Sequence, residues 1–159
     1  MVIETPRLRL VLESTQAVLA RIDAMSAADR AQVSPDWLVR MRCTAPSPWT
    51  HGFAIVEREA GVLVGSCGFK GPPDSDGAVE VAYGLDSNHR GRGYAKEATA
   101  ALVAFALGAG VRVVRANTLP DNDASGGVLK ACGFTRVGEV VDPEDGRVFR
   151  WELVAEGHS

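Results

Sequence analysis

The sequence has few of the features that disulfide-stapled, nucleic-acid-binding or secreted proteins show. Only three cysteines occur among its 159 residues, and Cys43, Cys67 and Cys132 stand far apart. An odd, scattered set argues against a disulfide framework and against a zinc site, so we interpret all three as small apolar side chains. The formal net charge is −3 and no long basic run is present, which makes a nucleic-acid-binding surface unexpected.

Long apolar runs are also missing. The first ten residues carry neither an apolar core nor a cleavage signature, so no signal peptide is expected. The most apolar stretch, residues 98–109, is too short to span a bilayer. We therefore expect a single domain over residues 1–159, located in the cytoplasm, as a monomer or homodimer. We expect no metal and no membrane contact.

What the sequence does contain is an alternation of strand and helix patterns. Helices are expected near residue 15, after Ser34, over 95–107 and after Asn122, because capping residues precede each of the first, second and fourth. This order predicts an α/β fold around a mixed, curved sheet, with 78–118 as a parallel right-handed crossover. The seven expected strands cover residues 7–12, 53–57, 62–69, 78–85, 111–118, 137–141 and 148–154.

A turn rich in glycine and arginine, residues 88–95, lies between an expected strand and an expected helix. The first amides of a helix lack internal partners and lie at the positive end of its dipole, so they form an anion site. Gly91 and Gly93 leave the backbone open to a phosphate, and Arg90 and Arg92 add positive charge. A plain surface turn is the alternative. The spacing fits neither a P-loop nor a dinucleotide fingerprint.

The turn also fits a known motif. Arg90, Gly93 and Ala95 match the acyl-CoA pattern Gln/Arg-x-x-Gly-x-Gly/Ala. The chain thereby resembles the GNAT superfamily of N-acetyltransferases, and within it the branch that acetylates ribosomal-protein alanine N-termini. Four further segments resemble that branch in the right order, at residues 5–10, at 80–85, at 94–98, and at 122–125 together with 133–134.

The resemblance implies a fold and a cofactor site. The GNAT fold is a single, strongly twisted mixed sheet of about seven strands, with helices on both faces and a splayed parallel strand pair. Acetyl-CoA is the implied co-substrate, with no metal. Its pantetheine arm would lie along Tyr83, Gly84 and Leu85. Its pyrophosphate would be held by the turn, at Arg90, Gly91, Arg92, Gly93, Tyr94 and Ala95.

Four further residues concern catalysis. Glu80 is the candidate base that takes the proton of the amine, and an outward-facing strand glutamate is the alternative. Asn122 resembles a residue that reaches the pantetheine, but a helix N-cap explains it equally. Ser125 is the candidate hydrogen-bond donor to the leaving sulfur, against a polar residue favoured near a helix start. Relatives often have a tyrosine acid where this chain has Leu129.

The function implied is transfer of acetyl to a primary amine, on a small molecule or a protein N-terminus, by direct attack in a ternary complex. A non-catalytic acyl-CoA sensor or regulatory module is an alternative from another class, and nucleotide-phosphate binding is a third. Trp37, Trp49 and Phe53 are candidates for lining the acceptor pocket, with core packing as the default explanation.

Overall fold

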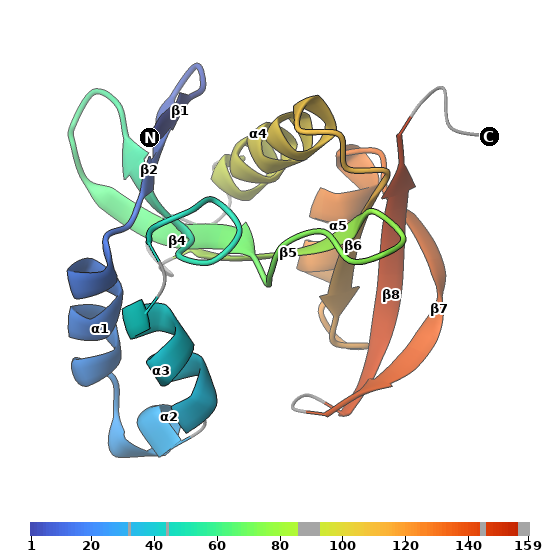
Figure 1. Ribbon diagram of the computed structural model, residues 1–159. Helices are drawn as coiled ribbons and strands as arrows, with labels where there is room; N and C mark the ends of the chain where they lie inside the picture. Colours follow the sequence, from blue (N-terminus) through green and yellow to red (C-terminus); the bar gives the residue numbers. More distant parts are fainter. Residues whose placement is uncertain (32, 44, 86–92, 144–145, 156–159) are drawn as a thin grey trace.

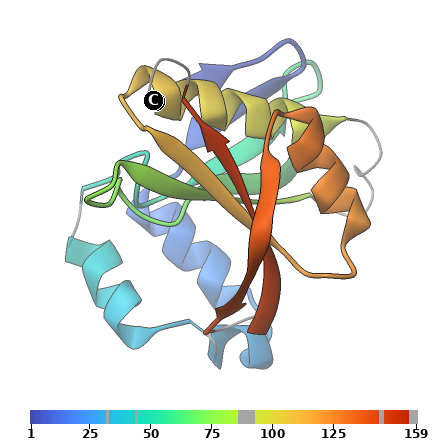
Figure 2. The same ribbon diagram turned by 90° about the vertical axis from the view of Figure 1, so that its right-hand side faces the viewer.

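The computed structural model describes residues 1–31, 33–43, 45–85, 93–143 and 146–155. Within these ranges the chain forms one twisted, eight-stranded mixed sheet and five helices (Figures 1 and 2). The strands are β1 (Val2–Glu4), β2 (Leu8–Leu12), β3 (Phe53–Glu57), β4 (Leu63–Phe69), β5 (Ala78–Leu85), β6 (Val113–Thr118), β7 (Thr135–Asp142) and β8 (Gly146–Val154). The helices are α1 (Thr15–Asp23), α2 (Ala27–Ala31), α3 (Pro35–Cys43), α4 (Tyr94–Gly108) and α5 (Asp123–Ala131).

The sheet has the strand order β1-β2-β3-β4-β5-β6-β8-β7, and its one parallel pair is β5 and β6. Their paired register covers only Ala78–Glu80 against Val113–Arg115. Beyond Glu80, β5 remains paired with β4, whereas β6 remains paired with β8 as far as Thr118. The two parallel strands therefore diverge in the middle of the sheet, as the resemblance to the GNAT fold implied.

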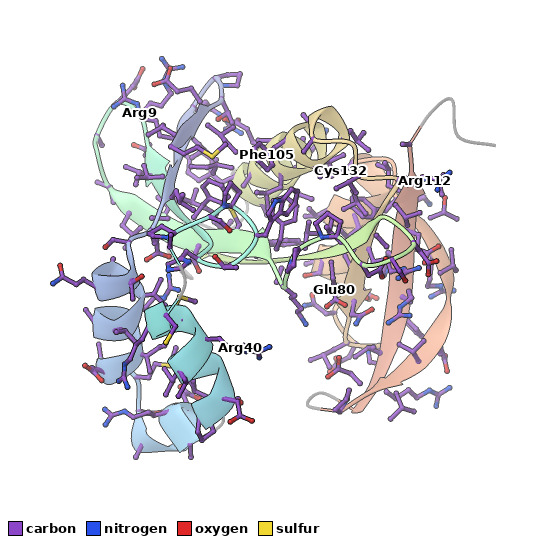
Figure 3. All side chains as sticks on the ribbon, viewed as in Figure 1. Arg9, Arg40, Glu80, Phe105, Arg112 and Cys132 are labelled. Atoms are coloured by element: carbon purple, nitrogen blue, oxygen red, sulfur yellow. The ribbon has the colours of Figure 1, made fainter. Side chains whose placement is uncertain are left out.

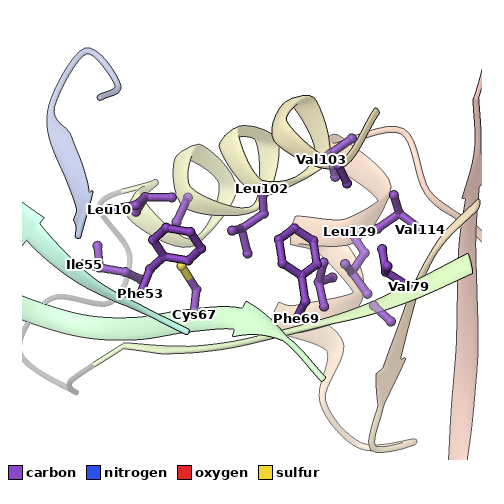
Figure 4. Close-up of a cluster of buried hydrophobic side chains, with 14 of the residues drawn as sticks. Leu10, Phe53, Ile55, Cys67, Phe69, Val79, Leu102, Val103, Val114 and Leu129 are labelled. Carbon is purple, nitrogen blue, oxygen red and sulfur yellow. The ribbon is translucent and has the colours of Figure 1, made fainter. Parts of the chain in front are cut away.

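The main core lies between α4 and the strands beneath it (Figure 4). Ala98, Leu102 and Ala106 are fully buried and recur every four residues, so they form one stripe along α4. On β5, Val79 and Val81 are buried in this core while Glu80 lies on the opposite face. This alternation fixes which side chains of β5 face α4 and which face away.

The helices α1, α2 and α3 lie on the other side of the sheet from α4, so both faces carry helices (Figure 1). They have a small core of their own, made of Val18, Ile22 and Met41. Ser14 caps α1, since its Oγ accepts a hydrogen bond from the Ala17 amide at 3.1 Å. None of the helices in the described part of the chain has the length and apolar character needed to cross a bilayer.

Several boundaries differ from those expected from sequence. Strand β1 and helix α2 were not expected, so the sheet has eight strands rather than about seven. Strand β6 begins at residue 113 rather than 111, because the Val111 amide donates to the Ala106 carbonyl in the last turn of α4 and the Arg112 amide donates to the Gly77 carbonyl before β5. Strand β7 begins two residues early, at Thr135, and ends at Asp142. The other strands and helices lie within one residue or two of their expected positions.

Candidate active site

A groove of about 410 Å³ lies where β5 ends and where α4 and α5 begin. We call it the α4–α5 groove. Three cofactor-binding candidates from the turn expected over residues 88–95, Arg90, Gly91 and Arg92, lie outside the described residues. The structure places around this groove the other eight residues expected to bind the cofactor, namely Tyr83, Gly84, Leu85, Gly93, Tyr94, Ala95, Asn122 and Ser125.

The start of α4 has the backbone shape that the sequence suggested. Gly93 is the N-cap, with φ 79° and ψ 8°, in the left-handed region that side chains disfavour. No side chain caps this end through a hydrogen bond. The first amides of α4 lie beyond the reach of the helix's own carbonyls, at the positive end of its dipole. A Cβ added at Gly93 would lie 3.1 Å from a guanidinium nitrogen of Arg7, so the small residue keeps this corner open.

Arg7 and Glu97 tie the start of α4 to the N-terminal strands. Arg7 Nε lies 2.8 Å from Glu97 Oε1, and the Arg7 amide donates to Oε2 of the same carboxylate at 2.8 Å. The guanidinium also lies over the ring of Tyr94, 4.9 Å from its centroid. The Tyr94 hydroxyl in turn donates to Glu57 Oε2 at 2.7 Å. This network holds the first turn of α4 against the sheet and keeps a cation beside Gly93.

The gap between β5 and β6 contains a second space, of about 220 Å³, which we call the inter-strand cavity. Asn122 caps α5 here, because its Oδ1 accepts from the Ser125 amide at 3.1 Å. The Tyr83 hydroxyl donates to the Ser125 carbonyl at 3.4 Å. Burial raises the pKa of this phenol above its ordinary value, although the side chain of Ser125 opposes the shift. Leu129, one turn further along α5, is fully buried in the core.

A third and larger space, of about 670 Å³, lies on the opposite side of the sheet, and we call it the α3-side cavity. Glu80 faces it from β5, and Arg40 reaches toward it from α3 (Figure 3). The Lys70 ammonium lies 2.7 Å from Glu80 Oε2. Trp49 lines the cavity and packs on Phe69, with ring centroids 4.8 Å apart. The cavity thus combines an aromatic wall with charges of both signs.

Two of the aromatic candidates for an acceptor pocket have different outcomes. Phe53 is fully buried in the main core, which confirms the default explanation of core packing over a place in a pocket. Nothing is described for the side chain of Trp37. His51, by contrast, lines the α3-side cavity although only 3% of it is exposed. Its Nε2 lies 2.8 Å from the Thr15 hydroxyl and its Nδ1 lies 2.7 Å from the Thr50 hydroxyl. Burial lowers the pKa of His51, which keeps the ring neutral.

The three spaces adjoin one another. Lys70 and Glu80 line both the α3-side cavity and the inter-strand cavity. Tyr83, Asn122 and Ser125 line both the inter-strand cavity and the α4–α5 groove. The inter-strand cavity thus shares residues with the spaces on both sides of the sheet where β5 and β6 diverge, with the Glu80 carboxylate on one side and the hydroxyl-bearing Tyr83 and Ser125 on the other.

This arrangement can be compared with known proteins. The family model described as acetyltransferase (GNAT) domain matches residues 9–135. The chain belongs to this family. The matched range contains β5, α4, β6 and α5, so it includes every residue that lines the α4–α5 groove.

Curated relatives and solved structures agree with that membership. Residues of the chain are 30% identical over 93 positions to an uncharacterized N-acetyltransferase, p20, of Bacillus licheniformis, covering 58% of this chain and 52% of the relative. They are 35% identical over 89 positions to the uncharacterized N-acetyltransferase YjdG of Bacillus subtilis strain 168, covering 54% and 53%. The chain spans about half the length of the curated relatives it matches.

Two solved structures share the GNAT fold over almost the whole chain. One is RimL, a ribosomal L7/L12 alpha-N-protein acetyltransferase in complex with coenzyme A, with a TM-score of 0.75, 18% identity and coverage of 99% of this chain and 100% of that one. Another is the ribosomal-protein-S5-alanine acetyltransferase of Vibrio fischeri, with a TM-score of 0.72, 17% identity and coverage of 100% and 99%. At such identities these structures establish the fold alone.

Sequence reasoning missed three features of the site. Tyr83 was considered only for its position on the strand, yet its hydroxyl reaches α5. Lys70 received no role, because nothing in the sequence shows that it stands opposite Glu80. The buried hydrogen bonds of His51 were also not foreseen. The position of Lys70 opposite Glu80 could have been found from the strand register, since β4 and β5 form a hairpin that pairs Phe69 with Val81.

Proposed function

We propose that this chain is an N-acetyltransferase that moves an acetyl group from acetyl-CoA to a primary amine by direct attack in a ternary complex. The observation that carries the proposal is the inter-strand cavity. It shares lining residues with a groove suited to a phosphorylated cofactor on one side of the sheet and with a cavity containing a carboxylate on the other.

The α4–α5 groove fits coenzyme A in both its parts. At one end, the left-handed Gly93 leaves room beside the Arg7 guanidinium that a Cβ would fill, and the positive end of the α4 dipole favours an anion. Along its length, Tyr83, Gly84 and Leu85 lie beyond the last residue of β5 that pairs with β6. Their strand edge suits the amide groups of a pantetheine arm, in the manner of an added strand. Asn122 lies at the same groove while it caps α5.

When bound, acetyl-CoA supplies an activated acetyl group, and the residues of this chain act on the protons and the charge. Glu80 accepts the proton that the amine loses, directly or through water, because its carboxylate faces the α3-side cavity. A backbone amide of β5 beside the diverging strands polarises the thioester carbonyl, an effect worth roughly 3–4 kcal/mol in other enzymes.

The leaving sulfur needs a hydrogen-bond donor, and Leu129 cannot serve. Ser125 and the Tyr83 hydroxyl both line the inter-strand cavity and the groove. The raised pKa of Tyr83 keeps its phenol protonated at neutral pH, so it remains a donor. We assign these two hydroxyls to the sulfur.

The acceptor is a primary amine, and protein N-termini are the class that the solved relatives favour. Two of them are named for the acetylation of ribosomal proteins, L7/L12 at the α-amino group and S5 at alanine. A peptide end is consistent with the α3-side cavity, because an aromatic wall of Trp49 and Phe69 lies beside Glu80 there. Small-molecule amines of similar size are the other acceptors to screen.

The test combines binding and turnover. Purified protein is titrated with CoA in a calorimeter, then mixed with acetyl-CoA and a panel of N-terminal peptides and small amines while free thiol is measured. Gly93→Glu should abolish CoA binding, because it places bulk and negative charge where the phosphates lie. CoA binding without thiol release from any amine would instead favour the non-catalytic sensor.

Glu80→Gln tests the assignment of the base. It should lower turnover by about 10²–10⁴-fold, the range that a positioned base contributes, with CoA affinity unchanged. Glu59→Gln is the matched control, since Glu59 lies exposed in the turn between β3 and β4. Equal turnover of the two variants across the pH range would remove Glu80 from the mechanism.

A further inference from the structure

The amine of Lys70 is held beside the proposed base. Lys70 directly follows β4, and its amide donates to the Glu80 carbonyl at 2.9 Å. Residues opposite each other on neighbouring antiparallel strands put their side chains on the same face. Lys70 Nζ accordingly lies 2.7 Å from Glu80 Oε2. The side chain that bears a primary amine is thus in contact with the carboxylate that would take a proton from one.

Lys70 also reaches the space where acetyl transfer is proposed to occur. It lines the α3-side cavity and the inter-strand cavity, and the second of these contains Tyr83 and Ser125. The side chain is 47% exposed. An ion pair this exposed holds its partners by only about 0–1 kcal/mol, so the amine can leave the carboxylate at little cost.

The other lysines are placed differently. The sequence contains only two besides Lys70. Lys96 lines the α4–α5 groove on the far side of the sheet, and Lys130 is exposed on the last turn of α5. The chain therefore offers one lysine at the proposed base and one exposed lysine that serves as an internal reference.

We propose that Lys70 is a self-acetylation site, modified by its own active site when no acceptor amine is bound. The inference rests on the proposed acetyl transfer. Glu80 takes a proton from the Lys70 ammonium, and the freed amine attacks the thioester carbonyl of bound acetyl-CoA. The new bond joins Nζ to the acetyl carbon while the carbon–sulfur bond breaks. The sulfur departs with a proton as the CoA thiol, and Lys70 becomes a neutral amide.

Modification of Lys70 would change the acceptor side of the site. Acetylation removes the positive charge and with it the ion pair to Glu80. The added acetyl group also occupies space at the junction of the α3-side and inter-strand cavities. Acetylated protein should therefore turn over added amines more slowly, whereas CoA binding at the α4–α5 groove should be unaffected. The reaction limits itself when acetyl-CoA is plentiful and acceptor is scarce.

The experiment follows each lysine by peptide mass spectrometry after the purified protein is incubated with acetyl-CoA alone. Lys70 should gain one acetyl group about 100-fold faster than Lys130, the lower end of what a positioned base contributes. The rate constant should be the same at two protein concentrations, since the reaction occurs within one chain. Glu80→Gln should slow Lys70 to the rate of Lys130, and Lys130→Arg should leave Lys70 modification unchanged.

Other outcomes have distinct meanings. Equal rates at Lys70 and Lys130, or a rate constant that rises with protein concentration, overturn the self-acetylation proposal. If the same preparation still releases thiol with an added amine, the proposed transferase function stands while this inference fails. If calorimetry shows no CoA binding at all, both fail together. Lys70→Arg, which keeps the charge, should abolish the mass gain at this peptide while CoA affinity is retained.

Discussion

Replacing Gly93 by alanine tests whether the backbone at the start of α4 is shaped for a phosphate. At φ 79° and ψ 8°, a side chain places its Cβ close to the following carbonyl oxygen. That clash costs roughly 1–2 kcal/mol. The new methyl group would also lie 3.1 Å from the Arg7 guanidinium, which must shift slightly to admit it.

This cost can appear in either of two measurements. If the variant keeps the left-handed turn, its free energy of unfolding in urea falls by roughly 1–2 kcal/mol. If the turn relaxes instead, the protein keeps its stability but the groove loses its shape. CoA affinity measured by calorimetry then falls by about 5- to 30-fold, the equivalent of the same free energy. The loss of unfolding free energy and the loss of CoA-binding free energy should together equal the cost of the clash.

Gly108→Ala is the matched control, because Gly108 is the last residue of the same helix. It is not among the glycines with positive φ, and an added Cβ would meet nothing within 4 Å. Alanine should raise the unfolding free energy by about 0.5–1 kcal/mol there and leave CoA binding unchanged. The reasoning is refuted if Gly93→Ala matches the wild-type protein in both unfolding free energy and CoA affinity.

Three further outcomes are expected. Tyr83→Phe removes the hydroxyl that reaches Ser125. Turnover should fall about fivefold, the equivalent of a hydrogen bond of roughly 1 kcal/mol, while CoA affinity stays constant. Unchanged turnover would exclude the phenol from the mechanism. Burial holds the pKa of folded His51 below 6.5, so the unfolded chain binds more protons than the folded one. The unfolding free energy should therefore fall as pH drops below 6.5. Urea titrations of His51→Gln should show a weaker fall with pH than those of the wild-type protein, and an equal fall would contradict the assignment to His51. Leu102→Ala should cost about 2–5 kcal/mol of unfolding free energy, whereas Val62→Ala, at an exposed position, should stay within about 0.5 kcal/mol.

The parts of the fold with strong local patterns were predictable from sequence. Strand β5 was expected at 78–85 and has these bounds, because a large apolar or aromatic residue recurs at every second position from Val79 to Leu85. Helix α5 follows the Asn122 cap that predicted it. Strand β1 was missed because its three residues form a strand by pairing with β2, and this partner is not apparent locally. Helix α2 was missed because it is five residues long and buries none of them.

The site shows the same division between local and long-range information. The glycine turn and the segments around Tyr83 and Asn122 are local motifs, and the structure brings their described residues to one groove. The pairing of Lys70 with Glu80 depends on the register of the β4–β5 hairpin across the loop at 71–77. The burial of Phe53, on β3, depends on the packing of the main core around it. Neither follows from a pattern within one segment.

The separate small core beneath α1 and α3 has a consequence for how this protein can change over evolution. Val18, Ile22 and Met41 hold these helices together independently of the main core under α4. Mutations on the exposed surfaces of α1 and α3 can therefore accumulate without loosening the strands that carry Glu80 and Tyr83. Under the proposed function, changes at Arg40 and Met41 of α3, which line the α3-side cavity, would alter the choice of amine while the residues of the α4–α5 groove stay constant.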